Sequence, residues 1–390
     1  RRSSDLEDSR ALLPEGVADE IIKILNHSEP NAVIANPGAP LNSSAPEYNP
    51  VPELSGDRIY FCAEGREAGK GGEDIWVFNL KTREAEPLSD LNTVDHEAPI
   101  GIGPDGRTLF VYSSLGAGPG NGDIYVSTRE GSRWKGLRAL PEPINTAHFE
   151  SDAFLSADGR ALFFTSDRPG IFPHRAKNRF SQGEWWGNTD IYVSPVHEGG
   201  SYGEPIHLGP VINTPAAERT PFLHPDGRTL YFSSSGHSGL GNLDIFKSVR
   251  QDDSWQNWSV PVNIGRVVNS AAADWGFMLT AAADRAYFSG SPQRKETNTD
   301  IYEVRPLPEL ARPAGVILSL RGRTEDLAGN PIKATILVQK SGQTDRHESD
   351  PATGEFYLTV PADQIQISAE RDGYQKQNVA FDFRKERQHA

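Results

Sequence analysis

The chain has 390 residues and a net charge of −14 at pH 7, and 24% of its residues are charged. An acid excess of this size repels phosphate backbones and anionic lipid headgroups, so neither nucleic acid nor a membrane surface is an expected partner. The sequence has no apolar run long enough to span a bilayer. Its 37 Gly and 29 Pro indicate many turns, and its one cysteine, Cys62, cannot form an internal disulfide.

Residues 1–31 are predicted to be an N-terminal extension with a short helix. Apolar residues recur there at roughly helical spacing: Val17, Ile21, Ile22, Ile24 and Leu25. Because this stretch reads as helix, we do not count it as a further copy of the strand repeat that follows.

Residues 32–305 contain five copies of one sequence unit. Each copy has an Asp-Ile dipeptide followed by an aromatic residue, and the dipeptides begin at Asp74, Asp123, Asp190, Asp244 and Asp300. A turn and a strand precede them, most clearly Pro-Asp-Gly-Arg-Thr-Leu at 104–109 and 225–230. The dipeptides are 49, 67, 54 and 56 residues apart. A repeat of this length made of short strands predicts the blades of a β-propeller.

Each copy can be divided into four short strands, a to d, with strand a innermost. Strand a follows an Asn-Ser or Asn-Thr step, and an acid stands five residues after each Asn. Residues 33–38 match the strand d segment 260–265, yet they precede the first strand a, and no strand d follows residue 304. We therefore predict an all-β fold: a five-bladed β-propeller over residues 32–305, closed by an N-terminal strand.

The remaining residues have a different pattern. Residues 306–315 form a Pro-rich linker. Residues 316–390 contain short alternating strands separated by turn residues, which predicts a small β-sandwich. Residues 311–390 carry 11 Lys and Arg against 11 Asp and Glu, so the acid excess lies in residues 1–310.

The repeated Pro-Asp-Gly-Arg-Thr-Leu-Tyr-Phe-Ser and Asp-Ile-Tyr pattern resembles the TolB-like, WD40-like propeller repeats of bacterial envelope proteins. Residues 316–384 resemble the carboxypeptidase regulatory-like domain, a transthyretin-like sandwich. A propeller followed by this sandwich resembles OmpA-family envelope proteins, among them the peptidoglycan-associated component of the type IX secretion system. The resemblance implies a periplasmic protein associated with the outer membrane or the cell surface. No OmpA-like segment is present in the sequence, so peptidoglycan binding is not carried over to any residue.

The acids of strand a are the first candidate binding residues. The d–a and b–c connections leave the disc on one face, since strands alternate in direction, and this face holds Glu47, Glu97, Glu150, Glu218 and Asp274. Such a ring at the channel mouth would attract a cation or a basic peptide. The favoured alternative is that each acid ties neighbouring blades together, because a residue repeated in every blade is usually architectural.

The b–c connection of the third copy is the second candidate site. It is a long insert, residues 167–189, that is rich in basic and aromatic residues of the types that anchor interfaces. The residues singled out are Arg168, His174, Arg175, Arg179, Trp185 and Trp186. Two other interpretations stay open: the loop folds over its own blade and buries its tryptophans, or the tryptophans stack on a sugar ring.

No cofactor is predicted, and no Cys/His cluster has metal-ligand spacing. His96-Glu97 lacks the second His of a zinc-protease helix, and residues 236–240 miss the nucleophile elbow at their last position. We therefore expect a non-enzymatic scaffold of the bacterial cell envelope that binds protein partners within a larger envelope or secretion assembly. The alternative is a carbohydrate-binding or glycoside-active propeller, since five-bladed glycosidases use carboxylates at the channel mouth.

Overall fold

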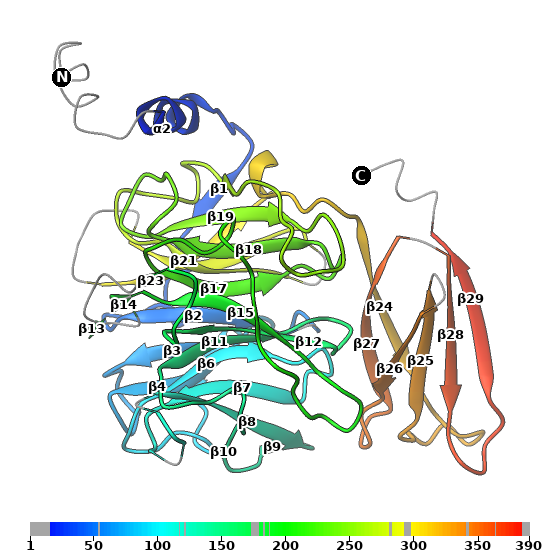
Figure 1. Cartoon of the computed structure of the whole chain (residues 1–390). Helices are drawn as coiled ribbons and strands as arrows, with labels where there is room; N and C mark the ends of the chain where they lie inside the picture. Colours follow the sequence, from blue (N-terminus) through cyan, green and yellow to red (C-terminus); the bar gives the residue numbers. More distant parts are fainter. Residues whose placement is uncertain are drawn as a thin grey trace.

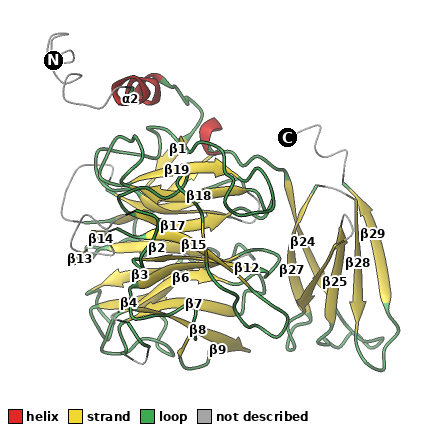
Figure 2. Ribbon diagram, viewed as in Figure 1, coloured by secondary structure: helices red, strands yellow, loops and turns green. Residues whose placement is uncertain are grey.

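The computed structural model describes residues 16–383, apart from 54, 117, 121, 173–178, 182–183, 187, 281–282, 292–297, 341–342 and 363. Only the backbone is described for the strand residues 179–181, 184–186 and 361. The regular secondary structure of this part of the chain is almost entirely strand, with one α-helix, α2 (Val17–Asn26), and one 3-10 turn, η1 (Glu309–Ala311) (Figures 1 and 2). The predicted all-β fold is therefore confirmed. Neither helical element is long and apolar enough to cross a membrane.

Residues 33–305 form five antiparallel sheets in the described part of the chain, one for each copy of the repeat. The strands of each sheet are given from the inner to the outer one. The first sheet contains β2 (Glu47–Pro52), β3 (Arg58–Glu64), β4 (Glu73–Asn79) and β5 (Glu84–Pro87), and the second contains β6 (Glu97–Ile102), β7 (Thr108–Ser113), β8 (Asp123–Glu130) and β10 (Arg138–Ala139), with β9 (Arg133–Trp134) also paired to β8. The third sheet contains β11 (Glu150–Leu155), β12 (Ala161–Ser166), β15 (Asp190–Pro195) and β16 (Ile206–His207). The last two are β17 (Glu218–Leu223), β18 (Thr229–Ser234), β19 (Asp244–Val249) and β20 (Val262–Asn263); and β21 (Trp275–Leu279), β22 (Ala286–Gly290), β23 (Asp300–Arg305) and β1 (Val33–Ala35).

The five sheets close into a ring. Neighbouring inner strands contact one another in the cyclic order β2, β6, β11, β17, β21 and back to β2. The fifth sheet takes its outer strand from the start of the chain, where β1 pairs antiparallel with β23 and Ile34 lies opposite Val304. The predicted closure by an N-terminal strand is therefore confirmed, and the ring leaves no inner strand unpaired.

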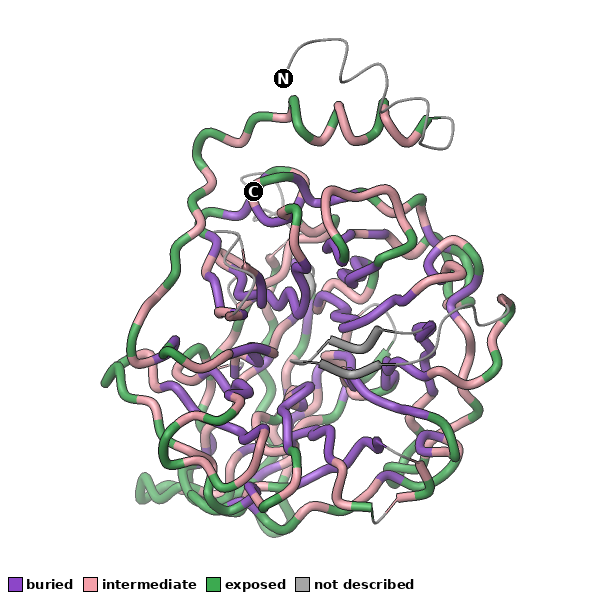
Figure 3. The backbone as a smooth tube through the Cα atoms, turned by 90° about the vertical axis from the view of Figure 1, so that its left-hand side faces the viewer, coloured by how far each residue is buried: buried purple, intermediate pink, exposed green. Residues whose placement is uncertain are grey.

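The core lies between neighbouring sheets rather than in one central mass. Aromatic residues of strands b and c fill these spaces, and Phe61, Phe164 and Phe232 at matching places in three copies are fully buried. Figure 3 shows the buried residues concentrated along the strands and the exposed ones in the connections. The strands b are continuous apolar runs, such as Leu-Phe-Val-Tyr at 109–112, because side chains on both faces of a blade are covered by its two neighbours.

The C-terminal residues form two further sheets around a separate core. One pairs β24 (Ile317–Arg323) with β27 (Glu355–Pro361). The other has the order β26 (Gln343–Glu348), β25 (Thr335–Lys340), β28 (Gln364–Glu370) and β29 (Gln377–Asp382). Their shared core contains Ile336, Val338, Leu358, Val360 and Ile365. Two sheets over one apolar core form a small sandwich.

This sandwich lies against the a–b turns of the propeller. The Arg160 guanidinium donates to the Thr344 carbonyl at 2.6 Å and lies 3.3 Å from the Asp345 carboxylate. Closer to the linker, the Gly315 amide donates to the Asp226 carboxylate at 2.9 Å. Figure 1 shows the sandwich on one side of the propeller and the hairpin of β13 (Arg179–Ser181) and β14 (Glu184–Trp186) on the other.

Candidate functional site on the free face

The face of the propeller that the sandwich does not contact carries the d–a and b–c connections, and we call it the free face. Two arginines of b–c connections tie these segments together. Arg66 donates to the Leu41 carbonyl at 3.1 Å, and Arg168 donates to the Ile144 carbonyl at 2.6 Å. The two kinds of connection therefore meet on one face, as the alternation of strand direction requires.

The asparagine that precedes each strand a clamps the preceding blade. Its side chain accepts from the amide and donates to the carbonyl of the isoleucine in that blade's Asp-Ile dipeptide, at 2.8–3.0 Å. Asn42 makes the same pair of bonds to Ile301, at 3.0 and 2.8 Å, across the closure of the ring. Satisfying both buried backbone groups with one side chain explains why the Asn recurs in every copy.

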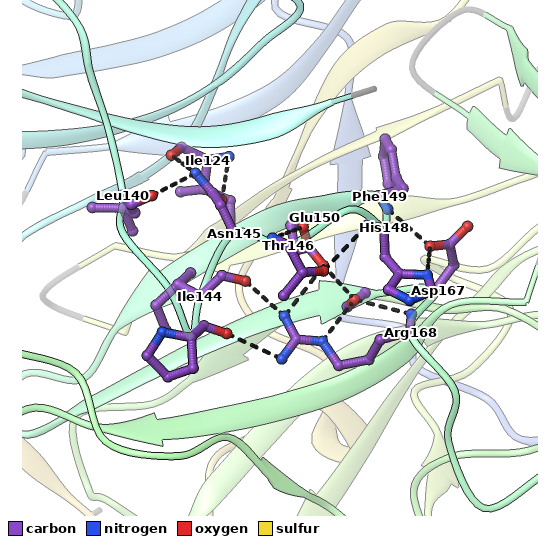
Figure 4. Close-up of polar contacts among 12 residues, drawn as sticks. Ile124, Leu140, Ile144, Asn145, Thr146, His148, Phe149, Glu150, Asp167 and Arg168 are labelled. Carbon is purple, nitrogen blue, oxygen red and sulfur yellow. Dashed lines mark hydrogen bonds and ion pairs between the residues drawn. The ribbon is translucent and has the colours of Figure 1, made fainter. Parts of the chain in front are cut away.

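The acid five residues later forms what we call the latch. Glu150 accepts from the Thr146 amide at 2.8 Å, from the Thr146 hydroxyl at 2.7 Å and from the Ser166 hydroxyl at 2.8 Å (Figure 4). Glu218 makes the equivalent three bonds to Thr214 and Ser234, each at 2.7 Å. The latch thus holds the start of strand a against strand b of the same blade.

The five latch acids do not form the exposed ring that the sequence suggested. Each of them is fully buried: Glu47, Glu97, Glu150, Glu218 and Asp274. Each acid accepts from the backbone amide four residues earlier, and the four glutamates also accept from the hydroxyl of that residue, so their charge is not presented at the channel mouth. The bonds support the architectural alternative, and a cation or basic peptide has no access to these carboxylates.

A basic side chain covers the latch in three copies. Arg66 and Arg168 lie 3.4 and 3.2 Å from Glu47 and Glu150, and each guanidinium also lies over two aromatic rings of its blade. In the fourth copy His237 takes this place. Its ring donates to the Ile212 carbonyl at 2.9 Å and packs against Phe232 and Phe246.

The histidine changes the electrostatics of the fourth latch. Among the described residues no cation pairs with Glu218, and burial raises the pKa of its carboxyl to about 8, against the opposing effect of its hydrogen bonds. Burial also lowers the pKa of His237 below its usual value. Both groups are therefore mainly neutral at pH 7.

The insert 167–189 is only partly described. Arg168 belongs to the cover over Glu150, and His174 and Arg175 lie outside the described residues. Arg179, Trp185 and Trp186 belong to the hairpin β13–β14, in which Arg179 lies opposite Trp186 and Phe180 opposite Trp185. Of the six residues predicted as one binding set, the four that the structure describes are thus divided between an architectural arginine and a separate hairpin.

The centre of the ring contains a buried ion pair. Arg219 contacts Asp152 of the neighbouring blade through two hydrogen bonds, at 2.8 and 3.0 Å, and Asp152 also accepts from the Thr220 amide at 3.1 Å. Although burial opposes ionisation, the Arg219 charge and these bonds hold the pKa of Asp152 below its usual value. The adjoining hollow is small, and it is lined by all five inner strands, including Asn49, Pro99 and Gly276.

A second polar cluster on the free face was missed in the sequence. Glu64 ends β3 and Glu73 begins β4, and the two lie directly opposite each other. The Tyr48 hydroxyl donates to Glu73, and the His96 ring nitrogen lies 3.4 Å from the same carboxylate. One signal was available: the residue before the Asp-Ile dipeptide is acidic only in the first copy. Among the described residues no group of three or more His, Cys, Asp and Glu side chains is arranged to hold a metal ion.

Comparison with known proteins shows the fold. No family model and no curated protein matches the chain. Solved structures that resemble it include TolB from Acinetobacter baumannii (14% identity, TM-score 0.40), with 69% of this chain and 56% of TolB covered. They also include an α-L-arabinofuranosidase from Podospora anserina, with 10% identity, a TM-score of 0.43, and 70% of this chain and 93% of that chain covered. A GH32 β-fructofuranosidase from Bombyx mori has 10% identity, a TM-score of 0.42, and 97% of this chain and 93% of that chain covered. At these identities and TM-scores the likenesses carry no argument about what the chain does.

The expectation that the protein is not an enzyme is contradicted by these comparisons. Glycoside hydrolases predominate among the similar structures, in the families GH62, GH43 and GH32. The sequence argument rested on the lack of a recognisable motif. A missing motif does not exclude an enzyme, because carboxylates that act on glycosides come from separate strands and carry no local signature.

Proposed function

We propose that the protein is a carbohydrate-active propeller that binds its glycan on the free face, at the insert 167–189. The observation that carries this proposal is the hairpin β13–β14, which brings Phe180 opposite Trp185 and Arg179 opposite Trp186 in one b–c connection. Aromatic residues combined with a few polar groups are the usual lining of small-molecule and sugar sites. The other face is in contact with the sandwich, which we take to be an accessory spacer over residues 316–390.

The latch acids have no catalytic role in this proposal. Glycoside hydrolysis needs two carboxylates that flank the substrate and differ in pKa. The five latch carboxylates are buried and hydrogen-bonded to their own connections, and Asp152 at the centre is paired with Arg219. Carboxylates that act on a glycan must therefore lie elsewhere on the free face.

A glycan array with the full chain tests the proposal. The wild type is expected to bind at least one glycan, and Trp185→Ala and Trp186→Ala are each expected to lose most of that signal. Tyr374→Ala removes a half-exposed aromatic residue from the sandwich and serves as the matched control, with unchanged binding. A wild type that binds nothing on the array, or a signal that survives both tryptophan changes, would contradict the proposal.

A protein ligand is the second candidate, within an envelope or secretion assembly in the periplasm near the outer membrane. It is favoured by the charge of the insert, which has several basic residues in a chain of net charge −14, so an acidic partner would be attracted there. The test replaces residues 169–187 by a Gly-Ser linker and compares partners recovered from native envelope extract. This candidate expects one partner that the wild type recovers and the variant does not.

A further inference from the structure

The cluster around Glu73 has the geometry of a small polar site. Glu64 and Glu73 are direct cross-strand neighbours at the b–c end of the first blade, which is on the free face. Like charges placed opposite each other in a sheet are destabilising, so this pairing breaks a local rule. Sequences tend to break such rules where a function requires it.

The two acids of this pair have few basic neighbours, and burial together with the Glu73 charge raises the pKa of Glu64. His96, at 3.4 Å from Glu73, is the cation in contact with it among the described residues. The two basic side chains of the adjoining b–c connection are used elsewhere. Arg66 bonds to Glu47 and to the Pro40 and Leu41 carbonyls, while Lys70 bonds to the Ser89 and Asn92 carbonyls at 2.8 and 3.0 Å.

Two carboxylate oxygens of the pair lack a hydrogen-bond donor. Glu73 is only 2% exposed, and apart from the His96 contact its Oε2 has no donor among the described residues. The Oε2 atom of Glu64 is also buried without a donor in this part of the chain. A buried carboxylate oxygen without a donor is destabilising, and a ligand with several N–H groups would supply the missing donors.

The geometry points to a subsite for a primary ammonium group between Glu64 and Glu73. The described residues offer no metal-binding group, so an organic cation fits better than a metal ion. This inference rests on the proposed function: on a face that binds glycan, the ligand class is an amino sugar with a free amine. His96, whose side chain is 53% exposed, forms the outer wall of the subsite, and Tyr48 orients Glu73 from within.

Isothermal titration calorimetry with two matched probes tests the inference: a β-1,4-linked glucosamine pentamer and its N-acetylated counterpart. The wild type is expected to bind the free amine form at least about tenfold more tightly, because hydrogen bonds to charged groups are worth about 1.5–3 kcal/mol. Glu64→Gln is expected to remove this preference. His96→Gln is expected to strengthen binding of the amine, since it removes a competing positive charge. If Glu64 and His96 had only structural roles, the two substitutions would not change the affinity for the amine in opposite directions.

Controls separate this inference from the proposed function. Glu67→Gln removes an exposed charge from the same b–c connection and should leave both affinities unchanged. Equal binding of the two pentamers, or binding of other glycans only, overturns the ammonium subsite while leaving the carbohydrate proposal intact. A lysine-rich peptide that binds in a Glu64-dependent manner, with no binding of either pentamer, overturns the amino-sugar class. Thermal unfolding of each variant identifies any that fails to fold. Glu64 is only partly buried, so its substitution is expected to disturb folding less than a substitution of Glu73.

Discussion

The third and fourth blades carry the same latch but cover it with different residues. In the third, Arg168 contacts Glu150 and donates to the Pro143 and Ile144 carbonyls. In the fourth, His237 donates to the Ile212 carbonyl, and Glu218 has no cationic partner among the described residues. The backbone geometry is shared, yet one latch holds a paired charge and the other a carboxyl whose pKa is raised to about 8. A repeat can therefore conserve shape while changing protonation.

The largest expected difference comes from removing the cover itself. Arg168→Met leaves the buried Glu150 without its cation and should lower the free energy of unfolding by about 3 kcal/mol. His237→Met removes one neutral hydrogen bond and should cost about 1 kcal/mol. Urea denaturation of both variants at pH 7 measures this difference. Equal losses would show that the two covers are energetically alike and would break the comparison.

Replacing the acids gives the second contrast. Glu150→Gln leaves the Arg168 guanidinium without a carboxylate and should cost about 2 kcal/mol at pH 7. Glu218→Gln replaces a largely protonated carboxyl by an amide of similar shape and should cost less than about 1 kcal/mol. Chemical denaturation at pH 7 again provides the measurement. A larger loss for Glu218→Gln would mean that this carboxyl is ionised in the folded protein.

The threonine bonds should be equivalent in the two blades. The Thr146 and Thr214 hydroxyls lie 2.7 Å from Glu150 and Glu218, so Thr146→Val and Thr214→Val should each cost about 1 kcal/mol. Unequal costs would show that the charge of the acid, and not only the geometry of the latch, sets the strength of the bond.

A further contrast is expected in the pH dependence of stability. Because the pKa of Glu218 is raised to about 8 in the folded protein, its stabilising contribution is present at low pH and is lost as the pH rises through about 8. His237→Arg supplies the missing cation and should reduce the decline in the free energy of unfolding between about pH 5 and pH 8. Glu218→Gln, which cannot titrate, should show the same flattening. Unchanged profiles in both variants would assign the decline to other groups.

Much of the fold could be predicted from local pattern, whereas the site could not. The recurrence of Asn followed by an acid five residues later indicated five equivalent strands, and the segment 33–38 indicated how the ring closes. The direction of the acid side chains was not predictable, because it depends on the turn that brings Glu150 back onto Thr146. Residues 236–240 were compared with a nucleophile elbow, which gave no role to His237, whereas its ring packs against Phe232 and Phe246. Because that contact joins residues of two different strands, no periodic pattern in the sequence predicts it.

The joint between β1 and β23 also constrains how the chain can reach its native state. Asn42 and Ile301, which bond across this joint, are 259 residues apart in the sequence. The fifth blade therefore cannot be completed until nearly all of the repeats have been synthesised, and the first residues of the array must wait for the last. Because closing so long a loop is entropically costly, the assembly of the ring should be slow relative to that of its individual blades.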